Sequence, residues 1–218
     1  MKQNIENLLQ AISQELRALE VARSKYAQQL APDFSIFNYI YTDEMMLSRM
    51  IADLLNPKGD HAQGAVFLSL FLQQLTNHHI YTFSDLKRAQ VSTEVVTSYS
   101  QTQRRMDIYI EIPSLHGDRS FGICIENKPF AADQFQQLTE YAAELERRHP
   151  QQQWHMIYLT GSDNDASTYS VVEQTLQQWK TEHLYTKIHY PCLNDWLDLC
   201  QAKSKNHKVS SFINAFSS

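Results

Sequence analysis

The chain has 218 residues, of which 43% are hydrophobic and 20% are charged, so it can bury a substantial core and is unlike a disordered chain. Its formal net charge of −5 argues against a surface coated with positive charge for indiscriminate nucleic-acid binding, although a local basic cleft is compatible with it. Three widely spaced cysteines argue against a disulfide framework, and the polar N-terminus argues against a signal peptide. No apolar run approaches the roughly 20 residues of a membrane span, which argues against a membrane protein. We therefore expect a cytoplasmic protein.

The N-terminal part of the chain carries helical patterns. Apolar residues at helical spacing predict a helix over residues 3–30. A second helix is expected after the Thr-Asp pair at 42–43, which suits a helix start, and before Pro57, which stops it. The loop 58–64 contains two glycines, and the apolar run 65–75 then predicts a buried helix.

The middle of the chain changes to strand patterns. Segments rich in β-branched residues or with alternating polarity predict strands, and longer amphipathic segments predict helices. We expect strands at 89–99, 104–112, 120–128 and 154–161, a helix at 133–149, and a tail with helices at 170–179 and 194–203 around a strand at 186–190. This order predicts an α/β fold with a central mixed sheet flanked by helices.

We expect these elements to form one domain over residues 1–218. Its parts would be a mainly helical region 1–86, a catalytic sheet core 87–160, and C-terminal helices in 161–218.

Two neighbouring predicted strands bring acidic and basic side chains to one face. Because successive side chains of a strand point to opposite faces, Glu126 and Lys128 share a face at the end of the segment FGICIENK. If the two strands are antiparallel neighbours, Asp107 near the start of the first lies beside Glu126 near the end of the second. The pattern therefore predicts a cluster of two carboxylates and one lysine.

Such a cluster suits metal-assisted hydrolysis of a phosphodiester. Two buried carboxylates raise each other's pKa unless a cation lies between them. Their oxygens suit Mg²⁺ or Mn²⁺, and a lysine beside the metal can orient a water molecule whose pKa the metal lowers. The alternative is a salt bridge at the surface, which contributes little to stability, and spacing alone favours that alternative.

The wider context resembles the PD-(D/E)XK nuclease superfamily. Between about Phe34 and Tyr158 the expected motifs follow in order: EMMLSRMIADLLNP with DHAQGAVFLSLFL, then VSTEV, RRMDIYI, IENK and QLTEY. The resemblance is to a prokaryotic branch with an N-terminal E-x-x-x-S helix, and it implies a restriction-endonuclease-like core. Met106 stands where the family often has Pro. Because proteins of this group are often longer, we expect the chain to be either a short or a truncated member.

The resemblance also implies roles for individual residues. Asp107 and Glu126 would bind Mg²⁺ or Mn²⁺ together with the backbone carbonyl of Asn127. Lys128 would position or activate the attacking water and stabilise charge on the phosphate. Glu44 would reach the metal directly or through water, and its helical register puts this carboxylate on a buried face, which is costly without a cationic partner.

Gln137 and Tyr141 match the Q-x-x-x-Y of the helix beside the site. Residues four apart share a helix face, so the spacing supports the match. An ordinary polar edge of an amphipathic helix is the alternative.

Further candidates lie around this cluster. Glu94 would be an additional carboxylate behind the metal ligands or a solvent-facing strand residue. His61 would orient Glu44 or touch a phosphate, or else cap a helix or pack its own loop. Arg104 and Arg105 would hold phosphates beside the scissile one. The basic stretch 203–208 is a solvated face or an auxiliary DNA contact.

The sequence therefore predicts a metal-dependent nuclease, with DNA as the expected substrate and endonucleolytic cleavage by water attack. The resemblance suggests a role in prokaryotic defence or mobile-element biology. The alternative is a catalytically silent nuclease-fold protein that binds nucleic acid or acts as a scaffold. RNA is the less favoured substrate. A homodimer is a further option, because cleavage of both strands of a duplex needs two sites.

Overall fold

The computed structural model describes residues 2–26, 43–75, 85–98, 103–115, 119–130 and 132–217. It divides into two compact units, Met1–Tyr41 and Thr42–Ser218. The described part of the first unit is dominated by helix α1 (Lys2–Lys25), as the apolar spacing predicts; residues 27–30 of the predicted helix lie outside the described residues. The apolar side chains that define its stripe are exposed: Ile5, Leu8, Leu9, Ile12, Leu16, Leu19 and Val21.

The second unit opens with two helices at their predicted places. Helix α3 (Glu44–Leu55) begins after Asp43, whose Oδ1 accepts a hydrogen bond of 2.7 Å from the backbone N–H of Met46. This contact satisfies one of the free N–H groups at the helix start. Helix α4 (Val66–Leu75) follows the loop, and its apolar residues enter the core.

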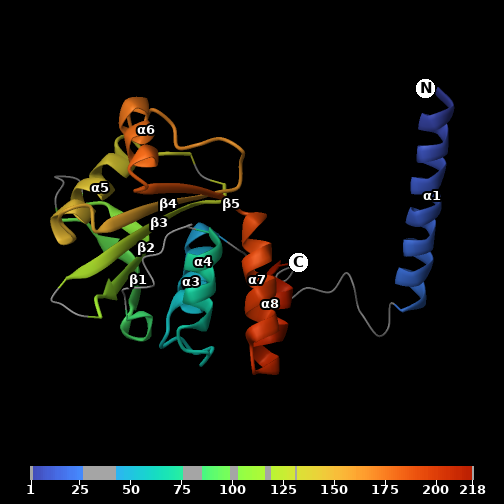
Figure 1. The fold of residues 1–218 in the computed structure, drawn as a ribbon, viewed down its shortest axis with the longest axis horizontal. Coiled ribbons are helices and arrows are strands. Elements are labelled where there is room, and N and C mark those ends of the chain that lie inside the picture. The colour runs from blue at the N-terminus through green and yellow to red at the C-terminus, as the bar shows by residue number, and fades with distance from the viewer. Residues whose placement is uncertain are drawn as a thin grey trace. The chain divides into compact units, whose positions relative to one another are not determined.

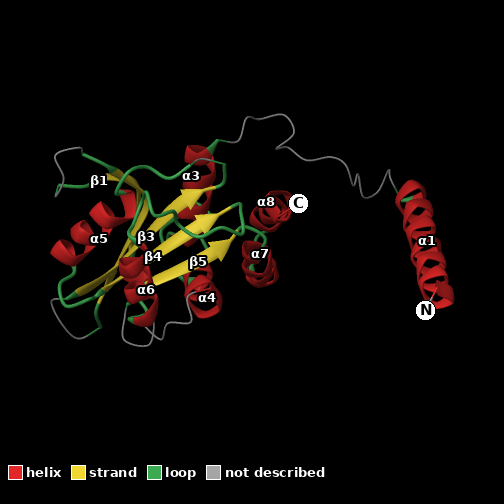
Figure 2. Ribbon diagram, turned by 90° about the horizontal axis from the view of Figure 1, so that it is seen from above, coloured by secondary structure: helices red, strands yellow, loops and turns green. Residues whose placement is uncertain are grey.

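A five-stranded mixed sheet forms the centre of the second unit, as the order of elements predicts. Its strands lie in chain order: β1 (Gln90–Val96), β2 (Arg105–Pro113), β3 (Ser120–Lys128), β4 (Trp154–Thr160) and β5 (Tyr185–His189). The first three are antiparallel to one another, whereas β3, β4 and β5 are parallel. Figure 2 shows that these three parallel strands end at the same edge of the sheet.

Helices cover both faces of this sheet (Figure 1). The remaining helices are α5 (Gln137–Arg148), α6 (Glu173–Thr181), α7 (Cys192–Lys203) and α8 (His207–Ser217), with a short 3₁₀ helix at Leu86–Arg88. Apolar residues of α5 and α6 pack with Tyr109 and Cys124 on one face. Those of α3, α4 and α7 pack with Ile108 and Ile125 on the other. A separate hydrophobic core therefore lies on each face of the sheet.

Several details differ from the sequence prediction, and three of them concern α5, α8 and Met106. Helix α5 begins at Gln137 rather than at 133, because Gln136 has a left-handed backbone with φ of 54°. Helix α8 was not predicted, since its first turn reads as part of a basic stretch. Met106 packs with the α5 core although alternation assigns it to the face of Ile108; on the partner strand Glu94 has φ of 56°, which interrupts regular alternation there.

Within the described residues, none of the helices is both long and apolar enough to span a membrane.

Candidate active site

The pairing register brings the predicted carboxylates together. Ile108 of β2 pairs with Ile125 of β3 in the antiparallel ladder, so Asp107 and Glu126 occupy the next facing positions. Their side chains point to the α5 face, and Lys128 lies two residues further on the same face. Asp107, Glu126 and Lys128 therefore lie on one face of the sheet, as alternation along the two strands predicts.

Asp107 is held by the backbone of the neighbouring strand. The N–H of Asn127 donates a hydrogen bond of 2.7 Å to Asp107 Oδ2. Asp107 is 9% exposed and Glu126 is fully buried. Two carboxyl groups thus lie next to each other with little water to stabilise their charges.

One oxygen of this pair has no hydrogen-bond partner in the part of the chain that the structure describes. Among the described residues, Glu126 Oε2 is a buried side-chain atom without any hydrogen-bond donor. An unsatisfied buried oxygen is costly, and such atoms in native proteins often mark an absent ion or ligand. The other oxygen, Oε1, is well satisfied by Lys128 and by Gln137.

The environment of the two acids is visible in their pKa values. Burial is the main cause that raises the pKa of Asp107 to about 6, although the Asn127 N–H and the charge of Lys128 oppose it. Burial and the neighbouring Asp107 raise the pKa of Glu126 well above its ordinary value. The pair therefore favours a cation that stabilises both negative charges.

Lys128 lies between two carboxylates. Its Nζ is 2.5 Å from Glu126 Oε1 and 3.4 Å from Glu44 Oε1, and its side chain is 4% exposed. Burial alone would lower the pKa of Lys128, but the charges and hydrogen bonding of the nearby acids, Glu126 first, raise it above the ordinary value. The side chain is therefore an ammonium cation at neutral pH.

The side chain of Asn127 fixes the helix that carries Glu44. Its Nδ2 donates to Ser48 Oγ at 2.9 Å and to the Glu44 carbonyl oxygen at 3.3 Å. Ser48 Oγ in turn donates to the same carbonyl, at 2.8 Å. Tyr190 OH donates to Asn127 Oδ1. Sequence reasoning used only the Asn127 backbone and missed this network, although alternation already places Asn127 on the face opposite Glu126.

Glu44 is the most accessible carboxylate of the cluster. It is the first residue of α3, and its side chain is 32% exposed. Its Oε1 faces Lys128, so the site opens to solvent on this side.

Gln137 and Tyr141 support Glu126 from α5. Gln137 Nε2 donates to Glu126 Oε1 at 2.6 Å and to Tyr141 OH at 3.2 Å. Tyr141 OH donates to the backbone carbonyl of Arg105. The Q-x-x-x-Y pair therefore connects β2, β3 and α5, and it is more than a polar helix edge.

The two arginines lie in different environments. The side chain of Arg104 is 13% exposed and forms an ion pair with Glu140 and a hydrogen bond with Gln134. Arg105 has 64% of its side chain exposed and lies 3.5 Å from Glu94. Arg105 is thus the more exposed of the two, whereas Arg104 is held against the segment before α5.

Two other candidates lie outside the central cluster. Glu94 occupies the β1 position facing Asp107, between the paired residues Thr93 and Val95, but its carboxylate turns to Arg105. His61 lies beyond the opposite end of α3 from Glu44. Its ring nitrogens contact Asn56 O at 2.9 Å and the Gln63 N–H at 3.0 Å, which fits loop packing.

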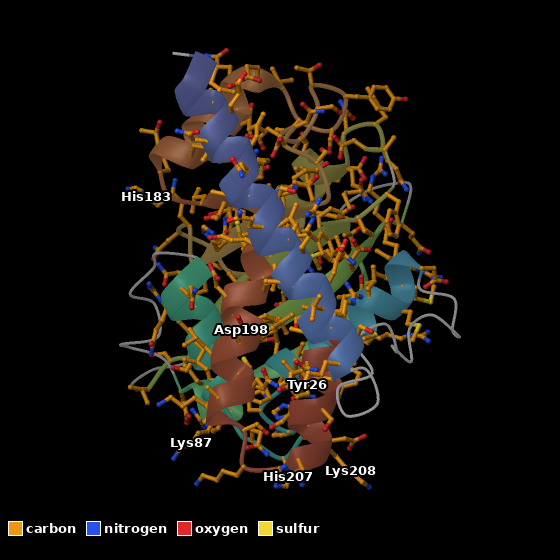
Figure 3. The ribbon with its side chains drawn as sticks, turned by 90° about the vertical axis from the view of Figure 1, so that its right-hand side faces the viewer. Tyr26, Lys87, His183, Asp198, His207 and Lys208 are labelled. Carbon is orange, nitrogen blue, oxygen red and sulfur yellow. The ribbon has the colours of Figure 1, made fainter. Side chains whose placement is uncertain are left out.

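The basic stretch near the C-terminus lies at the turn between α7 and α8. Figure 3 shows His207 and Lys208 at one end of the second unit. Helix α7 starts next to Tyr190 and rises about 18 Å over its length, so this stretch is remote from Asp107.

The donor set fits a divalent cation held by few protein ligands. Within the described ranges, no three His, Cys, Asp or Glu side chains form a ready metal cluster. Two adjacent carboxylates with the unpartnered Glu126 Oε2 nevertheless match the preference of Mg²⁺ for one or two carboxylates plus water and phosphate oxygens.

Comparisons with known proteins agree with this geometry. A family model described as PD-(D/E)XK nuclease superfamily matches residues 34–218. No curated protein and no solved structure matches the chain. The matched region contains the strand pair, the lysine and the supporting helix, and the chain therefore belongs to the PD-(D/E)XK nuclease superfamily.

Proposed function

We propose that this protein is a Mg²⁺- or Mn²⁺-dependent endonuclease that hydrolyses phosphodiester bonds in DNA. The observation that carries the proposal is the buried Glu126 Oε2, which has no donor among the described residues and lies beside the carboxylate of Asp107. A divalent cation would satisfy that oxygen and stabilise both acids. Membership of the nuclease superfamily supports the reaction class.

The ligands in this proposal are Asp107, Glu126 and the backbone carbonyl of Asn127, with Glu44 binding directly or through water. When bound, the cation supplies a water molecule of lowered pKa and stabilises negative charge on the phosphate. Asp107 is oriented for this by the Asn127 N–H, and Glu126 by Gln137. Both acids are thus positioned before any ligand arrives.

Lys128 acts in the proposal as a fixed cation. Its contact with Glu126 favours the protonated amine over a neutral amine that could abstract a proton. The ammonium instead orients the attacking water and stabilises charge as it develops on the phosphate oxygens. Glu44, at 3.4 Å from the same Nζ, holds the ammonium on the solvent side.

DNA is the proposed substrate, and Arg105 is the proposed phosphate contact beside the site. Its guanidinium is mostly exposed and suits phosphate oxygens. The net charge of −5 implies that DNA binding depends on such local contacts. The proposal is also compatible with a homodimer, which would present two sites to the two strands of a duplex. A role in prokaryotic defence or mobile-element biology is part of the proposal and rests on family membership alone.

Nicking of supercoiled plasmid tests the proposal. We expect nicking with Mg²⁺ or Mn²⁺, none with EDTA, and none by a Lys128→Met variant with either metal. Lys58→Met, which removes a lysine from the loop after α3, is the matched control and should nick like the parent chain. Plasmid binding without nicking under every metal would instead identify a silent nucleic-acid-binding protein, and full activity of Lys128→Met would show that the site is misassigned.

A further inference from the structure

An apolar cavity lies beside the end of β3 and has no role in the proposed hydrolysis. It has a volume of about 360 Å³, within the usual size range of small-ligand sites. Residues from several elements line it, among them Leu47, Pro129, Phe130, Tyr190, Asn194 and Leu197.

The cavity is joined to the candidate active site by the chain itself. Pro129 and Phe130 directly follow Lys128, and Leu47 is one helical turn from Glu44. Tyr190, in its wall, donates a hydrogen bond to the side chain of Asn127. Gly161 N–H donates to the Lys128 carbonyl at 3.1 Å, which fixes the end of β3 against the wall. The carboxylates of Asp107 and Glu126 point to the α5 face, so the cavity meets the candidate active site around the end of β3, where Lys128 lies 3.4 Å from Glu44. A molecule in the cavity would lie at this strand end.

Phe130 presents a large apolar ring to solvent beside the cavity. The side chain is 81% exposed, although it is large and apolar. Leaving such a ring in water gives no folding benefit, whereas a ring at the mouth of a cavity can stack on a flat partner. The neighbouring Asn194 offers an amide that can both donate and accept a hydrogen bond.

We propose that Phe130 and this cavity receive an unpaired nucleobase beside the scissile phosphate, so that single-stranded or locally opened DNA is the preferred substrate. A base has a flat apolar face and a polar edge, which match the aromatic ring and the amide. Stacking on aromatic side chains is a general way to hold unpaired bases. This inference rests on the proposed nuclease function, because the base belongs to the strand whose phosphate meets Asp107 and Glu126.

Fluorescence of a Phe130→Trp variant tests the base site without any hydrolysis. The three natural tryptophans are at most 8% exposed, so the introduced indole is the one that meets a ligand. The titrant is a thymidine single strand of about 12 nucleotides, which spans a usual single-strand site, in EDTA. We expect saturable quenching of the emission from the introduced indole, and none with an abasic strand of equal length. Leu115→Trp, exposed at the other end of β2, is the control and should stay unchanged.

The outcomes separate this inference from the nuclease proposal. Equal quenching by the abasic strand, or no quenching at all, overturns the base site even if DNA is hydrolysed. Base-dependent quenching in a chain that hydrolyses nothing keeps the base site and contradicts the nuclease proposal.

Kinetics provide a second measurement. In the Phe130→Ala variant we expect KM for a single-stranded substrate to rise about tenfold, because one stacked base is lost, while kcat changes less than about twofold. An unchanged KM contradicts the proposal.

Discussion

The backbone N–H of Asn127 donates a 2.7 Å hydrogen bond to Asp107 Oδ2. This contact joins the end of β3 to the start of β2 at the point where both carry a carboxylate. Because it uses the backbone N–H, it can form with any residue except proline at position 127, and it fixes the orientation of Asp107. The cluster of acids is therefore a consequence of strand pairing.

Replacing Asp107 with Asn is the most conservative test of its charge. An amide keeps an oxygen that can accept the Asn127 N–H, so we expect the variant to fold with an unchanged circular dichroism spectrum. Loss of the charge should reduce metal-dependent plasmid nicking by about 100-fold or more. Asp198→Asn, an exposed change on α7, is the control. Nicking by Asp107→Asn at the parent rate would show that this carboxylate is not needed.

Gln137 is expected to act through Glu126. Its Nε2 holds Glu126 Oε1 at 2.6 Å, and loss of such a supporting contact typically reduces metal affinity about 10- to 100-fold. Calorimetric titration of Gln137→Ala with Mn²⁺ should show this loss. Tyr141→Phe leaves the amide in place and should weaken binding less, and parent-like affinity in Gln137→Ala would contradict the positioning role.

The Asn127 side chain is expected to anchor α3. Asn127→Ala removes hydrogen bonds to Ser48, Glu44 and Tyr190 from a fully buried position. We expect the free energy of unfolding to fall by about 2 kcal/mol or more, because buried polar partners lose their contacts. Urea denaturation measures this, with Ser48→Ala as the smaller change, and an unchanged midpoint would exclude the anchoring role.

How much of this could be predicted from the sequence depends on the range of the interactions. The strand pair and the positions of Asp107, Glu126 and Lys128 follow from alternation and β-branched runs, because those signals are local. The Asn127–Ser48–Tyr190 network joins segments that are far apart in the chain, so no local pattern shows it. The ion pair of Arg104 with Glu140 likewise joins distant segments and has no local signal in the sequence; a phosphate contact by Arg104 stays a prediction.

Glu144 is expected to make the fold sensitive to acid. Burial acts to raise the pKa of Glu144, but hydrogen bonds from Arg147 and Arg148 outweigh it and lower the pKa to about 2. Because the pKa of Glu144 is lower in the folded state, its ionised form stabilises the fold at pH values above the ordinary pKa. This contribution is lost as the pH falls toward 2. Thermal unfolding should thus show a falling Tm between about pH 4.5 and 2.

The matched variant for this prediction is Glu144→Gln. It should unfold at a lower temperature than the parent at pH 7, and its Tm should depend less on pH in the acid range. Parallel pH profiles of the two proteins would show that Glu144 is not the group responsible.

Anomalous diffraction from crystals soaked in Mn²⁺ tests the central claim most directly. The account predicts one strong peak at coordination distance from both Asp107 and Glu126, close to the Glu126 Oε2 that lacks a donor, and its loss in the Asp107→Asn variant. Crystals that bind Mn²⁺ only elsewhere, with these two carboxyl groups left without metal, would contradict it.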